Sequence, residues 1–471
     1  MTGFLVVVFV VASEALYLAL LRLDAVNGAR PVTIFLAVLG AQFALCFAAY
    51  YIMRNKPAGS PLWALVVGGA LLFRLTLLPA GLPPELSWRE KLAAMRADWR
   101  GESVTYERFQ LFDDDIWRYL WDGHLAARGA NPYTSAPDDS SMDTLLVTGA
   151  TAQPDWETIR GNVNYLRIPT IYPPLAQMVF RASHALAPGS VLAMKIIVVG
   201  FDLLACVFLV LTLAELHEAP ARSILYGWNP LVIKVFAGSG HIDATVVAAL
   251  AAVCYFLARR KRTAASVSLG LAIAAKVFPV VLVPFLVRRV GSRRTVLAGA
   301  TALTCCIPYL GAGMHLFDGL WVFSATWRFN AGPFQFLTWV LGLFTSQPQL
   351  LARIAGAILV VGLLAILYRS DDAGPDTFAR PAVVTLVAML LLSPVVMPWY
   401  AVWLLPFGIV AWNRAAIFFS LAVCTAFLVM VRGMESPWAL LVEYGAVAGM
   451  IGWEVSRHHA RAPAPGAAAA P

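Results

Sequence analysis

The stretch GFLVVVFVVASEALYLALL, from Gly3 to Leu21, decides the fold, because Glu14 is the only charged residue in it. A helix rises about 1.5 Å per residue, so an apolar run of this length crosses the roughly 30 Å of hydrocarbon in a bilayer. It lacks a basic start and a small-residue cleavage pattern, and we therefore expect a retained helix. Similar apolar runs recur along the chain, beginning with residues 31–53 and 61–80.

Composition extends this reading to the whole chain. With 60% hydrophobic residues, 13% charged residues and a mean hydropathy of +0.72, the chain has more apolar surface than a water-soluble fold buries. In hydrocarbon every backbone polar group needs an internal partner, and helices provide it. We predict an all-α polytopic transmembrane helical bundle of about twelve spans, with a long outer loop that contains short helices.

The basic residues indicate orientation. The net charge of +8 does not indicate a nucleic-acid partner, because Lys and Arg fall in short clusters between apolar runs. Arg54 and Lys56 place their connection in the cytoplasm, and the clusters Arg259–Arg262 and Arg288–Arg294 should lie there too. The long acidic segment without a spanning run, residues 81–171, should therefore face outward.

These anchors predict four regions. They are three N-terminal spans in residues 1–80, an outer loop with interfacial helices in residues 81–188, a transmembrane bundle in residues 189–456 and a cytoplasmic low-complexity tail in residues 457–471. Residues 172–188 should form a shallow surface helix. Residues 263–287 cannot cross twice between two cytoplasmic clusters, so we expect a broken pair of short helices with Lys276 near the turn. Asp202 and Lys234, each inside a span, are expected to pair.

The stretch DDDIWRYLWDGH, which begins at Asp113, is the richest in reactive groups. Four of its residues share one face of a helix by their i, i+3, i+4 and i+7 spacing: Asp115, Arg118, Tyr119 and Asp122. The three aspartates could simply cap a helix start, where the macrodipole favours negative charge. Three adjacent carboxylates exceed what capping needs, however, and they repel one another. Such a cluster suits a proton acceptor or a divalent-cation site.

Further patterns follow in order along the chain. They are Gly129-Ala130-Asn131-Pro132-Tyr133, Tyr172-Pro173-Pro174, Gly240-His241-Ile242-Asp243-Ala244, Ala275-Lys276-x-x-Pro279 and Pro398-Trp399-Tyr400-Ala401-Val402-Trp403-Leu404-Leu405-Pro406. With the Asp-x-Asp-x-x-Arg-Tyr pattern that starts at Asp113, this ordered set resembles polyprenyl-phosphate-sugar-dependent membrane glycosyltransferases of the GT-C class. It is most similar to the glycosyltransferase 87 and bacterial alpha-mannosyltransferase groups. The resemblance covers about residues 110–410, with three aspartates where the pattern needs two and two extra spans at the start.

The resemblance implies transfer of a sugar, most simply mannose, from a polyprenyl phosphate to a glycolipid or glycan acceptor. The reaction would occur at the outer, periplasmic side of a bacterial inner membrane, so both substrates and membrane lipids are the expected partners. We expect Asp115 or, failing that, Asp113 to be the general base, with inversion at the anomeric carbon. Asp114 is the third catalytic candidate.

The candidate substrate-binding residues come from the patterns above and from one outer arginine. They are Arg118, Tyr119, Asp122, Asn131, Tyr133, Tyr172, His241, Asp243, Lys276, Arg328, Trp399 and Tyr400. Some have simpler roles open to them. His241 could be a structural histidine, and Lys276 could snorkel or pair at a broken helix instead of binding phosphate. Arg328 could fork onto a lipid phosphate or be an interfacial arginine among aromatic residues.

No cofactor or metal is required by this chemistry, because arginine or lysine can compensate the departing phosphate, although the aspartates could hold a divalent cation. A second hypothesis is a secondary transporter or a flippase for lipid-linked sugars, which would also use many spans and a broken helix. Such a protein should place its critical charges near the bilayer midplane. The densest acidic cluster lies instead in the outer loop, which favours the enzyme.

Overall fold

The computed structural model describes residues 1–23, 31–146, 154–374, 377–432 and 437–461, and these are helical or irregular apart from one β-bridge between Phe329 and Val395. Six described helical segments are long and apolar enough to cross a membrane: Thr2–Leu20, Val32–Met53, Val191–Glu215, Ser292–Thr326, Pro348–Ser370 and Arg414–Val431. Shorter apolar helices lie among them. The predicted all-α membrane bundle is confirmed, and the total of about twelve spans stays a prediction.

The first three helices form where the apolar runs predict them: α1 (Thr2–Leu20), α2 (Val32–Met53) and α3 (Leu62–Leu77). In α3, the buried Arg74 forks onto Asp202 of α8 (Val191–Glu215), with Nε 2.5 Å from Oδ2 and Nη2 3.1 Å from Oδ1. The partner of Asp202 is thus Arg74 and not the expected Lys234, whose Nζ lies 4.5 Å from the centre of the Phe427 ring. A planar guanidinium fits both oxygens of a carboxylate, which an ammonium does not.

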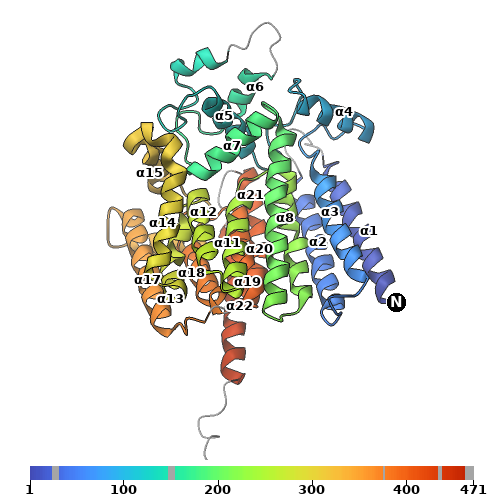
Figure 1. The fold of residues 1–471 in the computed structure, drawn as a ribbon, viewed down its shortest axis with the longest axis vertical. Helices are drawn as coiled ribbons and strands as arrows, with labels where there is room; N and C mark the ends of the chain where they lie inside the picture. Colours follow the sequence, from blue (N-terminus) through green and yellow to red (C-terminus); the bar gives the residue numbers. More distant parts are fainter. Residues whose placement is uncertain (24–30, 147–153, 375–376, 433–436, 462–471) are drawn as a thin grey trace, which may run out of the picture.

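Four α-helices in the described part of the chain between α3 and α8 cover one end of the bundle (Figure 1): α4 (Trp88–Trp99), α5 (Asp115–Ala127), α6 (Trp156–Asn162) and α7 (Pro174–Leu186). α4 starts with a capping box between Ser87 and Glu90. Near the end of α4, Asp98 accepts hydrogen bonds from the Ser190 hydroxyl and from the backbone N–H of Leu192. This carboxylate caps α8 and fixes α4 to the bundle. α5 packs along α7.

Four helices pack in a row: α8, α11 (Ala244–Ala258), α12 (Arg262–Ala275) and α14 (Ser292–Cys306), with α11 between α8 and α12 and with α14 packed against α12. α12 stops because Lys276 takes an extended backbone, with φ −155° and ψ 138°. Pro279 then lies in η4 (Phe278–Leu282), which leads into α13 (Val283–Val290). The predicted break near Lys276 is confirmed, since a proline removes the N–H that would continue the helix.

The remaining helices complete the bundle and its connections. They are η1 (Ser140–Leu145), η2 (Pro220–Ser223), α9 (Ile224–Gly227), α10 (Pro230–Ile233), η3 (Lys234–Gly238), η5 (Ile307–Phe317), α15 (Asp318–Thr326), α16 (Gly332–Leu341), α17 (Pro348–Ser370), α18 (Ala379–Leu391), η7 (Pro398–Leu404), α19 (Leu405–Val410), α20 (Arg414–Ala422), η8 (Val423–Thr425), α21 (Ala426–Arg432) and α22 (Pro437–Arg461). Residues 462–471 of the predicted tail lie outside the described residues.

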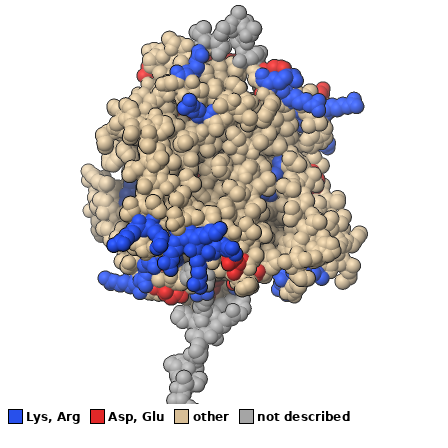
Figure 2. Space-filling view, in the orientation of Figure 1, with Lys and Arg blue, Asp and Glu red and all other residues tan. Residues whose placement is uncertain are grey.

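Charge is distributed unevenly along the bundle. In Figure 2, Lys and Arg gather most densely near the end opposite α4–α7. The positive-inside rule would place that end in the cytoplasm and the helices α4–α7 on the outer side.

Candidate active site

The three aspartates sit where an irregular loop enters α5. Before them, Leu111 and Phe112 have positive φ angles of 51° and 69°, which cost about 1–3 kcal/mol each for residues other than glycine. Asp113 Oδ1 accepts a hydrogen bond from the backbone N–H of Asp115, whereas Asp114 makes no capping bond through its side chain. Helix capping therefore accounts for one aspartate of the three.

A glycine-bounded turn holds this loop against the start of α11. A Cβ on Gly238 would lie 2.8 Å from Leu111 Cδ1, and one on Gly240 would lie 2.8 Å from Ile116 Cδ1. Gly240 also has a φ of 69°, which glycine adopts at low cost. Between them, the Ser239 hydroxyl donates to the Gln110 carbonyl. The positive φ of Gly240 is what requires glycine in this turn, whereas the Leu111 and Ile116 contacts involve the ends of flexible side chains.

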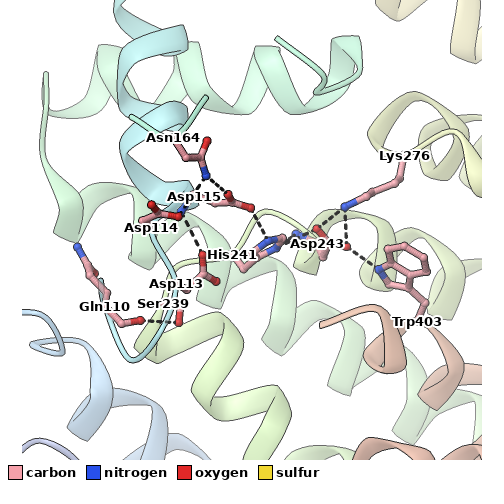
Figure 3. A network of polar contacts seen from close by, with 10 residues as sticks. All are labelled: Gln110, Asp113, Asp114, Asp115, Asn164, Ser239, His241, Asp243, Lys276 and Trp403. Carbon is pink, nitrogen blue, oxygen red and sulfur yellow. Dashed lines mark hydrogen bonds and ion pairs between the residues drawn. The ribbon is translucent and has the colours of Figure 1, made fainter. Parts of the chain in front are cut away.

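The residue that follows Gly240 is His241, which links two carboxylates (Figure 3). Its Nε2 lies 3.1 Å from Asp115 Oδ2, and its Nδ1 lies 2.9 Å from Asp243 Oδ2. The ring packs against Trp399, with centroids 4.3 Å apart. A histidine between two carboxylates is a donor at both nitrogens when it is protonated. The His-x-Asp pattern and the aspartate cluster, far apart in sequence, thus form one network.

Asp243 contacts three side chains: His241, Lys276 and Trp403. Lys276 Nζ lies 3.0 Å from Oδ1 and 2.9 Å from Oδ2, and Trp403 Nε1 donates to Oδ1 over 2.5 Å. Trp403 stacks on Tyr400, with ring centroids 4.0 Å apart. Because α12 ends at Ala275, the Lys276 side chain is directed to this carboxylate. The structure therefore places Lys276 in an ion pair within the site.

Burial and close charges shift the protonation of these groups. Burial, with Asp115 and Asp113 nearby, raises the pKa of Asp114 to about 7. Burial alone would raise the pKa of Asp115, but the hydrogen bond and charge of His241 lower it below its usual value. Burial disfavours the charged form of His241, yet Asp243, Asp113 and Asp115 raise its pKa to about 9. Asp115 is thus held as a carboxylate.

A cavity of about 270 Å³ opens beside this network. It is lined by Asp114, Asp115, Arg118, Asn164, Tyr165, Ile168, Pro169, Ile171, Tyr172, Pro173, Lys276, Val277, Gly319, Leu320, Phe323, Trp327, Phe329, Met397, Trp399, Tyr400 and Met430. Carboxylates, two cations and aromatic rings meet at one surface, and the rest of the wall is apolar. The cavity can therefore hold a hydroxyl beside a base, an anion beside cations and a sugar ring on aromatic faces.

Seven of the fifteen residues predicted for the site line this cavity: Asp114, Asp115, Arg118, Tyr172, Lys276, Trp399 and Tyr400. Asp113, His241 and Asp243 are buried next to it. Asp122, fully buried, accepts from Arg118 Nε over 2.8 Å and from Gln177 Nε2 over 2.8 Å, which ties α5 to α7. The predicted helix face thus turns toward the cavity at Asp115 and Arg118 and toward α7 at Asp122.

The other four predicted residues lie apart from the cavity. Tyr119 is fully buried and stacks on Phe180, with centroids 4.6 Å apart. Asn131 donates to the Tyr309 carbonyl, and the Tyr133 hydroxyl donates to the Tyr172 carbonyl. Arg328 is exposed.

Two residues of the site were not predicted. Asn164 Nδ2 donates to Asp115 Oδ1 over 2.7 Å and to Asp114 Oδ1 over 3.2 Å, so it joins the two carboxylates that line the cavity. No pattern in the sequence distinguishes Asn164 from a loop asparagine. Trp403, which anchors Asp243, lies within the Pro-Trp-Tyr-x-x-Trp-x-x-Pro stretch, and that stretch was the available signal.

Residues 108–292 match the sequence model of the MptA_B family, described as alpha-(1->6)-mannopyranosyltransferase, N-terminal domain. Comparison with curated proteins and with solved structures finds no match. The matched region contains the aspartate cluster, His241, Asp243 and Lys276, and it ends before Trp399 and Trp403. Together with the helices of membrane-spanning length, the match supports a membrane mannosyltransferase, consistent with the GT-C group that the sequence patterns resemble.

Proposed function

We propose that this chain transfers mannose from a polyprenyl-phosphate donor to a glycolipid or glycan acceptor. The observation that carries the proposal is the cavity, in which Asp115 faces the same space as Lys276 and Arg118. A base and two cations are what the reaction asks of the protein, since a hydroxyl loses a proton and a phosphate gains charge as it leaves. Tyr172, Trp399 and Tyr400 supply aromatic faces for sugar rings.

The proposed step is an inverting displacement. The acceptor oxygen forms a bond to the anomeric carbon while the bond from that carbon to the phosphate oxygen breaks, and the polyprenyl phosphate leaves with the electron pair. The acceptor proton passes to Asp115, which Asn164 and His241 hold in place through its two oxygens. Asp113 does not line the cavity, so it is not offered to the acceptor hydroxyl.

A lipid-linked donor also needs an apolar approach. Leu320, Phe323 and Trp327, on or next to α15, form part of the cavity wall, and nearby Met314 and Trp321 are exposed apolar side chains. A prenyl chain could therefore lie along α15 while its phosphate enters the cavity. The cluster of Lys and Arg at the opposite end supports an orientation with α4–α7 on the periplasmic side of a bacterial inner membrane.

The test uses membranes that contain the full chain and radiolabelled polyprenyl-phosphomannose. Wild type should transfer label to a glycolipid acceptor, and Asp115→Asn should lower the rate by about 10² to 10⁴-fold. Asp143→Asn is the matched control, because this exposed carboxylate in the same outer segment pairs only with Arg160 among the described contacts. It should leave transfer intact.

One result would overturn the proposal, and a second would reassign its base. Movement of the labelled lipid across the membrane without transfer would identify a flippase instead of an enzyme. Normal transfer by Asp115→Asn, with loss in Asp114→Asn, would move the base to Asp114, the other carboxylate that lines the cavity.

A further inference from the structure

An open groove lies between α11 and α12, at the end of the bundle opposite α4–α7. α11 begins directly after Asp243, and α12 ends directly before Lys276. The connection between the two helices therefore lies one helix length away from the active site, or roughly 20 Å. The groove has a volume of about 570 Å³, and its lining residues differ from those of the cavity. It is a separate feature of the molecule.

Two cations stand at one end of the groove. Lys261 and Arg262 line it, and both side chains are exposed. The nearby Arg259 has a carboxylate partner, with its Nη1 2.9 Å from Glu215 Oε2. Lys261 and Arg262 have no such ion pair within the described ranges of the chain. They therefore add two uncompensated positive charges to the basic end of the bundle that Figure 2 shows.

The rest of the groove is mainly apolar. Phe256 of α11 lines one side, and Ala264, Val267 and Leu271 share one face of α12 by their i, i+3 and i+7 spacing. From Arg262 to Leu271 this wall runs for about 13 Å, because a helix rises 1.5 Å per residue. A molecule in the groove would meet positive charge at one end and apolar side chains along the rest.

One polar side chain lies within the apolar wall. Ser268 lines the groove and is only 6% exposed. The Ser266 hydroxyl, on the preceding turn, donates to the carbonyl of Arg262 over 3.1 Å. The Ser268 hydroxyl makes no such bond to any residue that the structure describes. A polar group of a bound molecule, such as an ester carbonyl, would give this hydroxyl a partner.

A membrane lipid with an anionic headgroup matches this pattern. Inorganic phosphate has no apolar part to cover the wall of α12, and a zwitterionic lipid brings a positive group next to Lys261 and Arg262. The positive-inside rule places this end in the cytoplasm, where the leaflet contains anionic headgroups. Basic pockets between membrane helices on that side bind such headgroups.

We propose that the groove between α11 and α12 binds one anionic phospholipid of the cytoplasmic leaflet. Lys261 and Arg262 contact its phosphate, and one acyl chain lies along Phe256, Val267 and Leu271. The bound lipid holds the start of α12, the helix whose end places Lys276 against Asp243. The site stands independently of the proposed function, because its residues lie outside the cavity.

The test counts bound lipid by native mass spectrometry. The full-length chain, purified in detergent and stripped of lipid, is titrated with phosphatidylglycerol or with phosphatidylcholine of the same acyl chains. Wild type should bind one phosphatidylglycerol in preference to phosphatidylcholine. Lys261→Gln with Arg262→Gln should weaken phosphatidylglycerol binding by about 30-fold, or about fivefold for each charge removed. Val267→Trp, which keeps both charges but fills the apolar wall, should weaken it as well.

The matched control is Arg293→Gln with Arg294→Gln. It removes two exposed charges near the start of α14, and neither arginine lines the groove. Its phosphatidylglycerol binding should equal that of wild type, which separates the groove from the general attraction of a basic surface.

Four outcomes would overturn the proposal. They are equal binding of the two lipids by wild type, equal loss in the control and in the groove variants, displacement of phosphatidylglycerol by inorganic phosphate, and tighter binding of a polyprenyl phosphate. The comparison of the two lipids is read on wild type, so the test survives a variant that fails to fold. Loss of the lipid site would leave the mannosyl-transfer proposal intact, and loss of transfer in wild type would leave the lipid site intact.

Discussion

The contact between α5 and α7 leads to a sharp prediction at Gly123. A Cβ added there would lie 2.4 Å from the carbonyl oxygen of Phe180 and 2.8 Å from its carbonyl carbon. These are backbone atoms, so no side-chain rotation relieves the clash. Ordinary contact begins at 3.4 Å, and Gly123→Ala therefore requires α7 to retreat by about 1 Å, the difference between 3.4 Å and 2.4 Å.

This retreat should reach the cavity. Tyr172 and Pro173, which line it, lead directly into α7. We predict that Gly123→Ala lowers the stability by about 1–3 kcal/mol, the usual cost of overpacking. We also predict that the rate of mannosyl transfer falls roughly 10²-fold, because a 1 Å displacement of groups around a reacting centre has that effect.

The assay compares thermal inactivation and transfer rate in detergent. Gly161→Ala is the control, since this helical glycine of α6 lies in the same outer segment and a Cβ there meets nothing within 4 Å. The control should match wild type or gain slightly in stability. If Gly123→Ala inactivates at the same temperature as the control and transfers at the same rate, the close approach of α5 and α7 does not shape the site.

Two further predictions concern the network and the outer helices. Trp403→Phe keeps a ring against Tyr400 but removes the hydrogen bond to Asp243. Because a hydrogen bond to a charged group is worth about 1.5–3 kcal/mol, the rate of transfer should fall at least about tenfold. An unchanged rate would show that this hydrogen bond does not contribute to the reaction. Burial, with His124 and Arg128 nearby, lowers the pKa of His184 to about 4 in the folded chain. The unfolded chain therefore binds this proton more readily, and the stability of the fold should decrease as the pH drops from about 6.5 toward 4. Thermal inactivation at pH 7.5 and pH 5 checks this, and His184→Phe should show a smaller loss at pH 5 than wild type.

Local patterns identified several residues that line the cavity, and packing explains which of the others lie elsewhere. The 3.6-residue period placed Asp115, Arg118 and Asp122 on one face of α5, and they share it. Periodicity does not show what packs against a helix face. Here Asp115 and Arg118 line the cavity, whereas Asp122 contacts α7. In the same way, two charges inside spans indicated an ion pair for Asp202 but not its partner, because Arg74 in α3 meets α8 only in the folded bundle.

The sequence by itself determined that the chain is a helical membrane bundle, because an apolar chain in hydrocarbon must satisfy its backbone within helices. Its ordered patterns also indicated the class of chemistry. Only the tertiary structure decided which two of the three aspartates line the cavity. Asp113, Asp114 and Asp115 are adjacent in sequence but leave the chain in different directions where the loop turns into α5. Their surroundings therefore depend on the fold. Asp115 meets His241 and Asn164, Asp114 meets Asn164 and the cavity, and Asp113 accepts from the backbone N–H of Asp115 while its second oxygen is buried without a hydrogen bond.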